Sequence, residues 1–275
     1  MHLSVSTDGK VMNWHLHRPD RFNALGPSLG QELLNALRAL QGTLADWDRK
    51  DGSREPAIRS LVITATAVHI GRESPIWIAG GDLKELQSLV EPSEGRSYAW
   101  LLAELCSGLQ DLPIPVIAAI DGLAIGGGAE LAIAADLRLA TQRSAFHFKQ
   151  LEVGLATGYG SCQRLIALVG QARATDLLLR CRRLSATEAL PLGLVNELVE
   201  KPDDLAQSIK ELTHDFSQIS AQALRSQKFM LQQPSHDRRG HLIQGELDAF
   251  EDLWMQPAHK KFLSGFSERA ASAEN

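Results

Sequence analysis

The segment from Val116 to Asp136, VIAAIDGLAIGGGAELAIAAD, constrains the fold of this chain more than any other. It begins with an apolar run typical of a buried strand, continues through four glycines within residues 122–128, and ends with residues suited to a helix. Such a turn leaves free backbone N–H groups at the start of the helix, and glycine lets a ligand oxygen approach them. We therefore expect a helix that begins near Gly127 or Gly128, beside a ligand site.

Glu130 falls in the first turn of this predicted helix, in otherwise apolar surroundings. The helix dipole favours the ionised carboxylate and the apolar neighbours disfavour it, so its pKa can lie in the range that a general acid or base needs. The plainer alternative is a first-turn glutamate that points to solvent. The glycines before Glu130 and the alanines and leucine after it favour a catalytic role.

Two further glycine-rich turns occur in the chain. In WIAGGDLKEL (77–86), Gly80 and Gly81 precede a short helix, and their N–H groups could join those near Gly127 in binding one oxygen, as an oxyanion hole does. Taken alone, this segment is better explained as an N-capped loop. In FHFKQLEVGLATGYGSCQRL (146–165), Glu152 could place a second carboxylate near Glu130, so that one water is held between two groups, although by itself Glu152 is better explained as a surface or turn glutamate.

The elements around these turns alternate between strands and helices. We predict a hairpin over residues 2–17, strands near 58–66, 114–121 and 137–141, and helices over 28–40, 83–89, 98–112, 161–170 and from Asp203 onward. Ser28 and Gln31 are spaced as a capping box for the first helix. This order predicts an α/β fold with right-handed crossovers and mostly parallel strands.

Composition and charge exclude several classes of protein. The net charge of -5 leaves no broad basic face, so nucleic acid is not expected as a partner. No apolar run approaches the roughly 20 residues that span a bilayer, and the first residues lack a signal core, so we expect a cytoplasmic protein without a membrane partner. The three cysteines form no CxxC pair and no HExxH is present, so no metal site is predicted.

Two catalytic or nucleotide-binding patterns also fail. The glycines from Gly122 to Gly128 do not match GxGxxG, and no Gly-Lys-Ser/Thr follows them, which argues against a bound nucleotide. The segment from Gly26 to Gly30 matches GxSxG, but it does not follow a buried strand. A serine hydrolase that uses Ser28 is therefore a distant alternative.

In combination, these segments resemble the crotonase superfamily, also called the enoyl-CoA hydratase/isomerase superfamily. The matching pieces occur in family order and cover most of the chain to about residue 200: HRPDRFNAL (17–25), IAGGDLKEL (78–86), the run over 114–140, FKQLEVGL with GYGSCQRL (148–165) and LSATEALPLGLVNELV (184–199). The resemblance implies a spiral core of repeated ββα units over residues 1–200. It also implies a helical region over 201–275 that forms homotrimers, which often stack as hexamers.

The resemblance further implies a coenzyme A thioester as ligand, with coenzyme A as part of the substrate and no separate cofactor. Gly81 and Gly127 match the two oxyanion-hole donors, and Glu130 and Glu152 look like the carboxylate pair of the hydratase members. The residues that resemble walls of the coenzyme A site are Asn23, Ala24, Leu25, Ala79, Gly80, Asp82 and Leu83. The implied reaction, typical of fatty acid metabolism, hydrates a 2-enoyl-CoA to a 3-hydroxyacyl-CoA, or reverses this, through a thioester enolate.

Departures from the hydratase pattern keep other functions open. The loop ATAVHIGRESPIW (65–77) is longer than usual and is expected to reshape the acyl pocket or its lid. Leu151 replaces a proline, and VGL with GYG resembles some decarboxylating members. Decarboxylation of an acyl-CoA or isomerisation of an enoyl-CoA with the same oxyanion hole is the nearest alternative. A coenzyme A-binding or assembly protein without useful turnover is a third.

Overall fold

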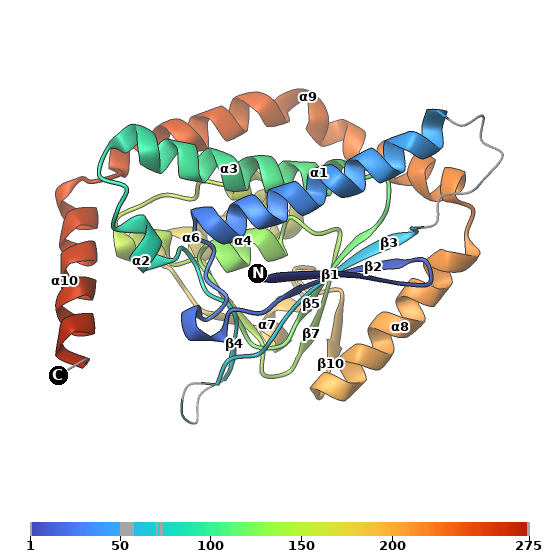
Figure 1. Ribbon diagram of the computed structural model, residues 1–275, viewed down its shortest axis with the longest axis horizontal. Coiled ribbons are helices and arrows are strands. Elements are labelled where there is room, and N and C mark those ends of the chain that lie inside the picture. The colour runs from blue at the N-terminus through green and yellow to red at the C-terminus, as the bar shows by residue number, and fades with distance from the viewer. Residues whose placement is uncertain (1, 50–57, 70, 72–73, 274–275) are drawn as a thin grey trace.

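A computed structural model describes residues 2–49, 58–69, 71 and 74–273 and contains two β-sheets among many helices (Figure 1). The larger sheet has the strand order β1-β2-β3-β5-β7-β10, with β1 (Leu3–Asp8), β2 (Val11–Leu16), β3 (Ser60–Ala65), β5 (Val116–Ile120), β7 (Leu137–Thr141) and β10 (Glu197–Val199). The smaller sheet has the order β4-β6-β8-β9, with β4 (Ile76–Ile78), β6 (Leu123–Ile125), β8 (Ala145–His147) and β9 (Leu184–Ser185). Pairing is parallel except for β1 with β2 and β8 with β9.

The chain builds both sheets together in a spiral. The pairs β3 and β4, β5 and β6, and β7 and β8 each place one strand in the larger sheet and the next in the smaller sheet before a helical segment follows. These segments are α2 (Leu83–Leu86) and α3 (Pro92–Asp111), then α4 (Gly127–Ala132), then the 3-10 helix η2 (Gln150–Val153) with α5 (Ser161–Val169) and α6 (Gln171–Leu179). The predicted α/β spiral of ββα units is therefore confirmed.

Helices cover both faces of the larger sheet (Figure 1). The helices α1 (Pro27–Arg49) and α3 lie over one face, where their leucines join the main hydrophobic cluster with Trp14 and Trp77. The helix α8 (Pro202–Gln218) lies on the other face, where Leu205 packs with Ile117 and Leu139 in a smaller cluster. Between these helices, β5 is buried throughout and β3 is largely buried, as is usual for parallel strands that are covered on both faces, whereas the edge strand β1 is mostly exposed.

The first helix begins differently from the prediction. The helix α1 starts at Pro27, so Ser28 lies inside its first turn and is not the N-cap residue. The Ser28 N–H and Oγ–H both donate to Glu85, at 2.9 and 2.6 Å. The predicted capping box of Ser28 with Gln31 is wrong, because a carboxylate from a distant turn satisfies the free N–H group that a local cap would have bound.

The C-terminal third adds two more helices, α9 (Ala221–Leu253) and α10 (Pro257–Ala273). The helix α9 packs along α3, and its Leu247 and Phe250 belong to the same hydrophobic cluster as the strands and α1. The boundary predicted at residue 200 remains a prediction. No helix in the described part of the chain is both long and apolar enough to cross a bilayer.

Candidate active site

Two glycine-rich turns meet at one edge of the smaller sheet. Strands β4 and β6 are parallel neighbours, with Ile78 opposite Ala124, so the turns that follow them emerge at the same edge. The second turn needs glycine twice: Gly126 has a positive φ of 49°, and a Cβ atom on Gly128 would lie 2.2 Å from the carbonyl oxygen of Ile78. The absence of side chains therefore lets α4 begin directly against β4.

The backbone donors predicted for an oxyanion hole lie on one cavity. Gly81 and Gly127 both line a cavity of about 280 Å³, and neither N–H has a backbone acceptor among the described residues. A Cβ atom on Gly80 would lie 3.5 Å from the nitrogen of Gly127, so the two turns are in van der Waals contact. Two free N–H groups on one cavity suit a ligand oxygen that gains negative charge during a reaction.

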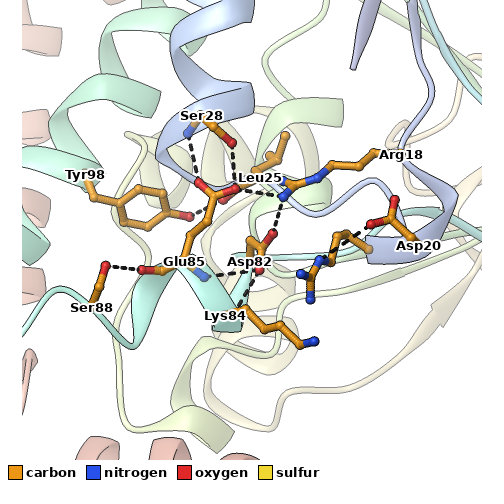
Figure 2. Close-up of polar contacts among 10 residues, drawn as sticks. Arg18, Asp20, Leu25, Ser28, Asp82, Lys84, Glu85, Ser88 and Tyr98 are labelled. Carbon is orange, nitrogen blue, oxygen red and sulfur yellow. Dashed lines mark hydrogen bonds and ion pairs between the residues drawn. The ribbon is translucent and has the colours of Figure 1, made fainter. Parts of the chain in front are cut away.

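A polar network anchors the turn that carries Gly81 (Figure 2). Arg18 Nη2 lies 2.9 Å from Asp82 Oδ2 and 2.8 Å from Glu85 Oε1. Asp82 Oδ1 caps α2 by accepting from the N–H groups of Lys84 and Glu85. Burial disfavours the charge on Glu85, but hydrogen bonds from Ser28 and Arg18 outweigh this and hold the pKa of Glu85 below its usual value. Ser28 thus has a structural partner and is not among the residues that line the cavity.

The residues predicted to form the coenzyme A walls fall into two groups. Ala79, Gly80 and Leu83 line the cavity, whereas Asn23, Ala24, Leu25 and Asp82 are buried behind it. Asn23, at a positive φ of 54°, donates from its amide to the carbonyl oxygens of Thr66 and Trp77 at 2.8 Å each. The Leu25 N–H donates to the Gly80 oxygen at 2.9 Å. Ala79, Gly80 and Leu83 therefore form the wall of the cavity, and the four residues buried behind them support it.

Glu130 is the carboxylate that the structure brings to the cavity. Its residue surface is only 2% exposed, and its Oε1 accepts from the Gly158 N–H at 3.2 Å. Burial and the nearby charge of Glu246 raise the pKa of Glu130 to about 7, although Ser161, Gln150 and the Gly158 N–H favour its charged form. Near neutral pH both protonation states are therefore populated, which is the condition for a group that takes up and returns a proton.

The structure does not bring Glu152 to Glu130. Glu152 is absent from the cavity lining, its side chain is 44% exposed, and it lies 3.2 Å from Lys149 Nζ and 3.4 Å from His147 Nε2. The reason is the 3-10 turn of η2, which places every third residue on the same side. Gln150 and Val153 consequently line the cavity, and Glu152 points away from it. The position expected for a second carboxylate is occupied by the amide of Gln150.

The sequence reasoning missed an aromatic wall. Tyr98, Tyr159, Phe250 and Phe262 line the cavity, with Trp254 stacked on Phe250 at a centroid distance of 5.4 Å. The Tyr98 hydroxyl donates to the Leu25 oxygen at 2.8 Å, so it accepts from the Tyr159 hydroxyl, which is 2.6 Å away. Only the GYG motif signalled Tyr159, since helical spacing in α3, α9 and α10 does not show which apolar residues face a cavity.

A second carboxylate, Glu246 of α9, is partly buried, lies near enough to raise the pKa of Glu130, and was also missed. Glu246 accepts from the Ser161 N–H at 3.0 Å and the Cys162 N–H at 2.9 Å, at the start of α5. Residues 158–162 therefore bind each carboxylate through two N–H groups, since those of Gly158 and Tyr159 donate to Glu130 Oε1 at 3.2 and 3.5 Å. The helix α9 thus fixes the turn that holds Glu130.

The role predicted for the loop over residues 65–77, in the acyl pocket or its lid, stays a prediction. None of its described residues is among those that line the cavity. Val68 instead pairs with Ile76 in an antiparallel bridge, and residues 70 and 72–73 lie outside the described part of the chain. The helices α9 and α10 contribute the wall instead, and α10 stands beside the end of the molecule that carries α2 (Figure 1).

Comparisons with known proteins show which chains this sequence is similar to. The family model described as enoyl-CoA hydratase/isomerase matches residues 6–273. The chain is 29% identical over 265 residues to the short-chain-enoyl-CoA hydratase of Clostridium acetobutylicum, across 96% of this chain and 94% of that protein. It is 30% identical over 255 residues to an enoyl-CoA isomerase/hydratase of Mycosarcoma maydis, across 92% of this chain and 88% of that protein.

A solved structure shows the same fold. The crystal structure of enoyl-CoA hydratase from Bacillus halodurans superposes with a TM-score of 0.82 at 23% identity, over 96% of this chain and all of that chain. At this identity the likeness concerns the fold alone.

No cluster of three or more residues suited to hold a metal ion occurs in the part of the chain that the structure describes.

Proposed function

Because this chain belongs to the enoyl-CoA hydratase/isomerase family, we propose that it hydrates a 2-enoyl-CoA thioester to a 3-hydroxyacyl-CoA, or catalyses the reverse dehydration. The observation that carries this proposal is the presence on one cavity of two free glycine N–H groups, at Gly81 and Gly127, together with the buried carboxylate of Glu130. The similarity to a protein named short-chain-enoyl-CoA hydratase supports the same substrate class.

In the proposed mechanism, the thioester oxygen accepts hydrogen bonds from Gly81 and Gly127. As a water oxygen bonds to the β carbon, the water gives a proton to Glu130, and the electrons of the double bond move to the thioester as an enolate. Glu130 then returns the proton to the α carbon, so that H and OH are added and no electrons are exchanged. The oxyanion hole stabilises the enolate selectively, which lowers the barrier without tighter binding of the substrate. Coenzyme A enters only as part of the substrate.

Isomerisation of the enoyl double bond is the second candidate. Among the described residues that line the cavity, Glu130 is the only carboxylate, and Gln150 stands where a second one was expected. Moving a double bond requires one group that takes a proton from the α carbon and returns it to the γ carbon. The relative named as an isomerase/hydratase supports this candidate.

The first experiment follows the conjugated thioester absorbance of crotonyl-CoA. The unaltered chain should remove this absorbance, and Glu130→Gln should lower the rate by about a hundredfold or more, since it removes the acid–base group. The matched variant Glu152→Gln should keep its rate, because its carboxylate points away from the cavity.

Three other results would change the proposal. Full turnover by Glu130→Gln would refute the role of Glu130, and a large loss in Glu152→Gln would restore the two-carboxylate mechanism. If crotonyl-CoA is unchanged but a 3-enoyl-CoA gains conjugated absorbance, the reaction is isomerisation.

The proposal extends to assembly and location. A homotrimer or a pair of trimers is supported by Phe229, Met230 and Leu231 on α9, whose residue surfaces are 61%, 57% and 72% exposed. Three adjacent exposed apolar residues are typical of a contact surface. Light scattering of the purified protein tests this, and a monomer at micromolar concentration contradicts it.

The free thiols of the three cysteines suit a cytoplasmic location, where thiols stay reduced.

A further inference from the structure

His259 lines the cavity and has one ring nitrogen without a partner among the described residues. It lies near the start of α10, its residue surface is 1% exposed, and it belongs to the cavity lining. Its Nδ1 lies 3.0 Å from the carbonyl oxygen of Val153, and its Nε2 is buried without a hydrogen-bond partner among the described residues. A buried polar atom without a partner costs free energy, so this nitrogen needs an explanation.

The contact with Val153 determines what Nε2 can do. A carbonyl oxygen only accepts, so Nδ1 must carry the hydrogen, and in the neutral ring Nε2 is then an acceptor. Burial lowers the pKa of His259, which favours the neutral ring, although the contact with Val153 opposes this. The partner that Nε2 lacks is therefore a hydrogen-bond donor.

The ring is held firmly in this orientation. Its centroid lies 4.7 Å from that of Trp254, whose indole N–H donates to the Leu89 oxygen at 3.1 Å. On the other side, a Cβ atom on Gly154 would come within 2.8 Å of the His259 backbone nitrogen, so this glycine lets α10 approach η2 closely. Because the tilted contact with Trp254 and the hydrogen bond to Val153 both hold the ring, its orientation is fixed before any ligand arrives.

We propose that His259 is a ligand-binding residue whose Nε2 accepts a hydrogen bond from a donor group of the bound acyl-CoA. This inference rests on the proposed function, which supplies the ligand. Donors of such a ligand include the hydroxyl of the 3-hydroxyacyl product and, on the coenzyme A part, the amide N–H groups of the pantetheine arm. Apart from Glu130, Lys149 and Gln150, the other described cavity residues are glycine, apolar or aromatic, so His259 adds a polar contact to the wall that the C-terminal helices form.

The test compares two ligands that differ by one hydroxyl, butyryl-CoA and 3-hydroxybutyryl-CoA. Their dissociation constants are measured by calorimetry in a Glu130→Gln background, so that the hydroxylated ligand is not dehydrated, and butyryl-CoA is also titrated into the unaltered chain. The key variant is His259→Asn, whose amide can still donate to the Val153 oxygen but does not reach the place of Nε2. The companion variant His259→Gln has a longer side chain that can place an amide oxygen there. Thermal unfolding checks that both variants fold.

The loss of one hydrogen bond should weaken binding roughly twofold to tenfold in His259→Asn, and less in His259→Gln. Weaker binding of 3-hydroxybutyryl-CoA alone identifies the acyl hydroxyl as the donor, whereas equally weaker binding of both ligands places the donor on the coenzyme A part that they share. Unchanged binding of both ligands by a folded His259→Asn protein overturns the inference and leaves the proposed function intact. If the unaltered chain does not bind butyryl-CoA, the proposed function fails first.

Discussion

Glu130 serves proton transfer at the site, and its burial lowers the folding stability of the protein. It lies in an apolar helix because it serves a cavity, and the same burial raises its pKa to about 7. The glycine turns before it and the Gly158 N–H hold its side chain toward the cavity. A proton-transfer group of this kind is therefore obtained at the expense of folding stability, as is common at active sites.

The effect of the buried Glu130 carboxylate on the free energy of unfolding can be measured. Between the ordinary glutamate pKa of 4.5 and the folded value of about 7, the folded protein binds more protons at Glu130 than the unfolded chain does. Stability from this group therefore falls as the pH rises through that range. Glu130→Gln should raise the free energy of unfolding at pH 8 by roughly 1–3 kcal/mol and change it little at pH 4.

Urea denaturation at the two pH values checks this expectation. Equal stability changes at pH 4 and pH 8 would show that the buried charge has no net cost. The same variant is expected to lose activity, so stability and turnover should move in opposite directions.

At the scale of single elements, the glycine turns and their helices were predictable from the sequence. Which residues of η2 face the cavity was not. The predicted oxyanion-hole glycines and Glu130 lie on one cavity because β4 and β6 are parallel neighbours, which the strand–helix alternation implies. In an extended strand, residues 150 and 152 would lie on the same side. The 3-10 turn instead joins residues 150 and 153, and only tertiary packing decides between these two conformations.

The contact between α4 and β4 gives a prediction for two neighbouring glycines. In Gly128→Ala the new methyl meets the backbone oxygen of Ile78 at 2.2 Å, which cannot move without displacing the strand. In Gly127→Ala it meets the ring of Tyr159 at 2.9 Å, and a side chain can rotate. We expect Gly128→Ala to destabilise the protein by about 3 kcal/mol or more, and Gly127→Ala by about 1 kcal/mol.

Chemical denaturation of the two variants decides the matter. A Gly128→Ala protein as stable as the unaltered chain would mean that α4 does not start against β4. Similar losses in both variants would mean that Tyr159 is as immobile as the strand.

On the scale of the whole molecule, the C-terminal helices are part of the site. Phe250, His259 and Phe262 line the cavity although they lie more than a hundred residues after Glu130 in the chain. No local pattern indicates such a contribution, since α9 and α10 were recognisable as helices but their approach to the cavity depends on packing against α3 and η2. The sequence therefore predicted the residues at the catalytic edge of the cavity but not those of the wall that α9 and α10 form.

The effect of α9 on the catalytic residue can be measured through Glu246. Its charge raises the pKa of Glu130, so replacing it with the neutral Glu246→Gln should lower that pKa. Glu130 must be ionised to take a proton from water, and the acid limb of the pH profile of kcat/KM should therefore move to lower pH.

A variant on the same helix, Asp248→Asn, serves as control because Asp248 pairs with Arg96 outside the cavity. Its profile should stay in place. A Glu246→Gln profile that also stays in place would show that the two carboxylates are not coupled.

The cavity lining runs from Ala79 to Phe262, and this span has a consequence for synthesis on the ribosome. A growing chain that has reached Leu253 contains every strand of both sheets but lacks α10, which supplies His259 and Phe262. Such a chain contains Gly81, Gly127 and Glu130 but neither His259 nor Phe262, so the wall of the cavity is complete only once α10 is present.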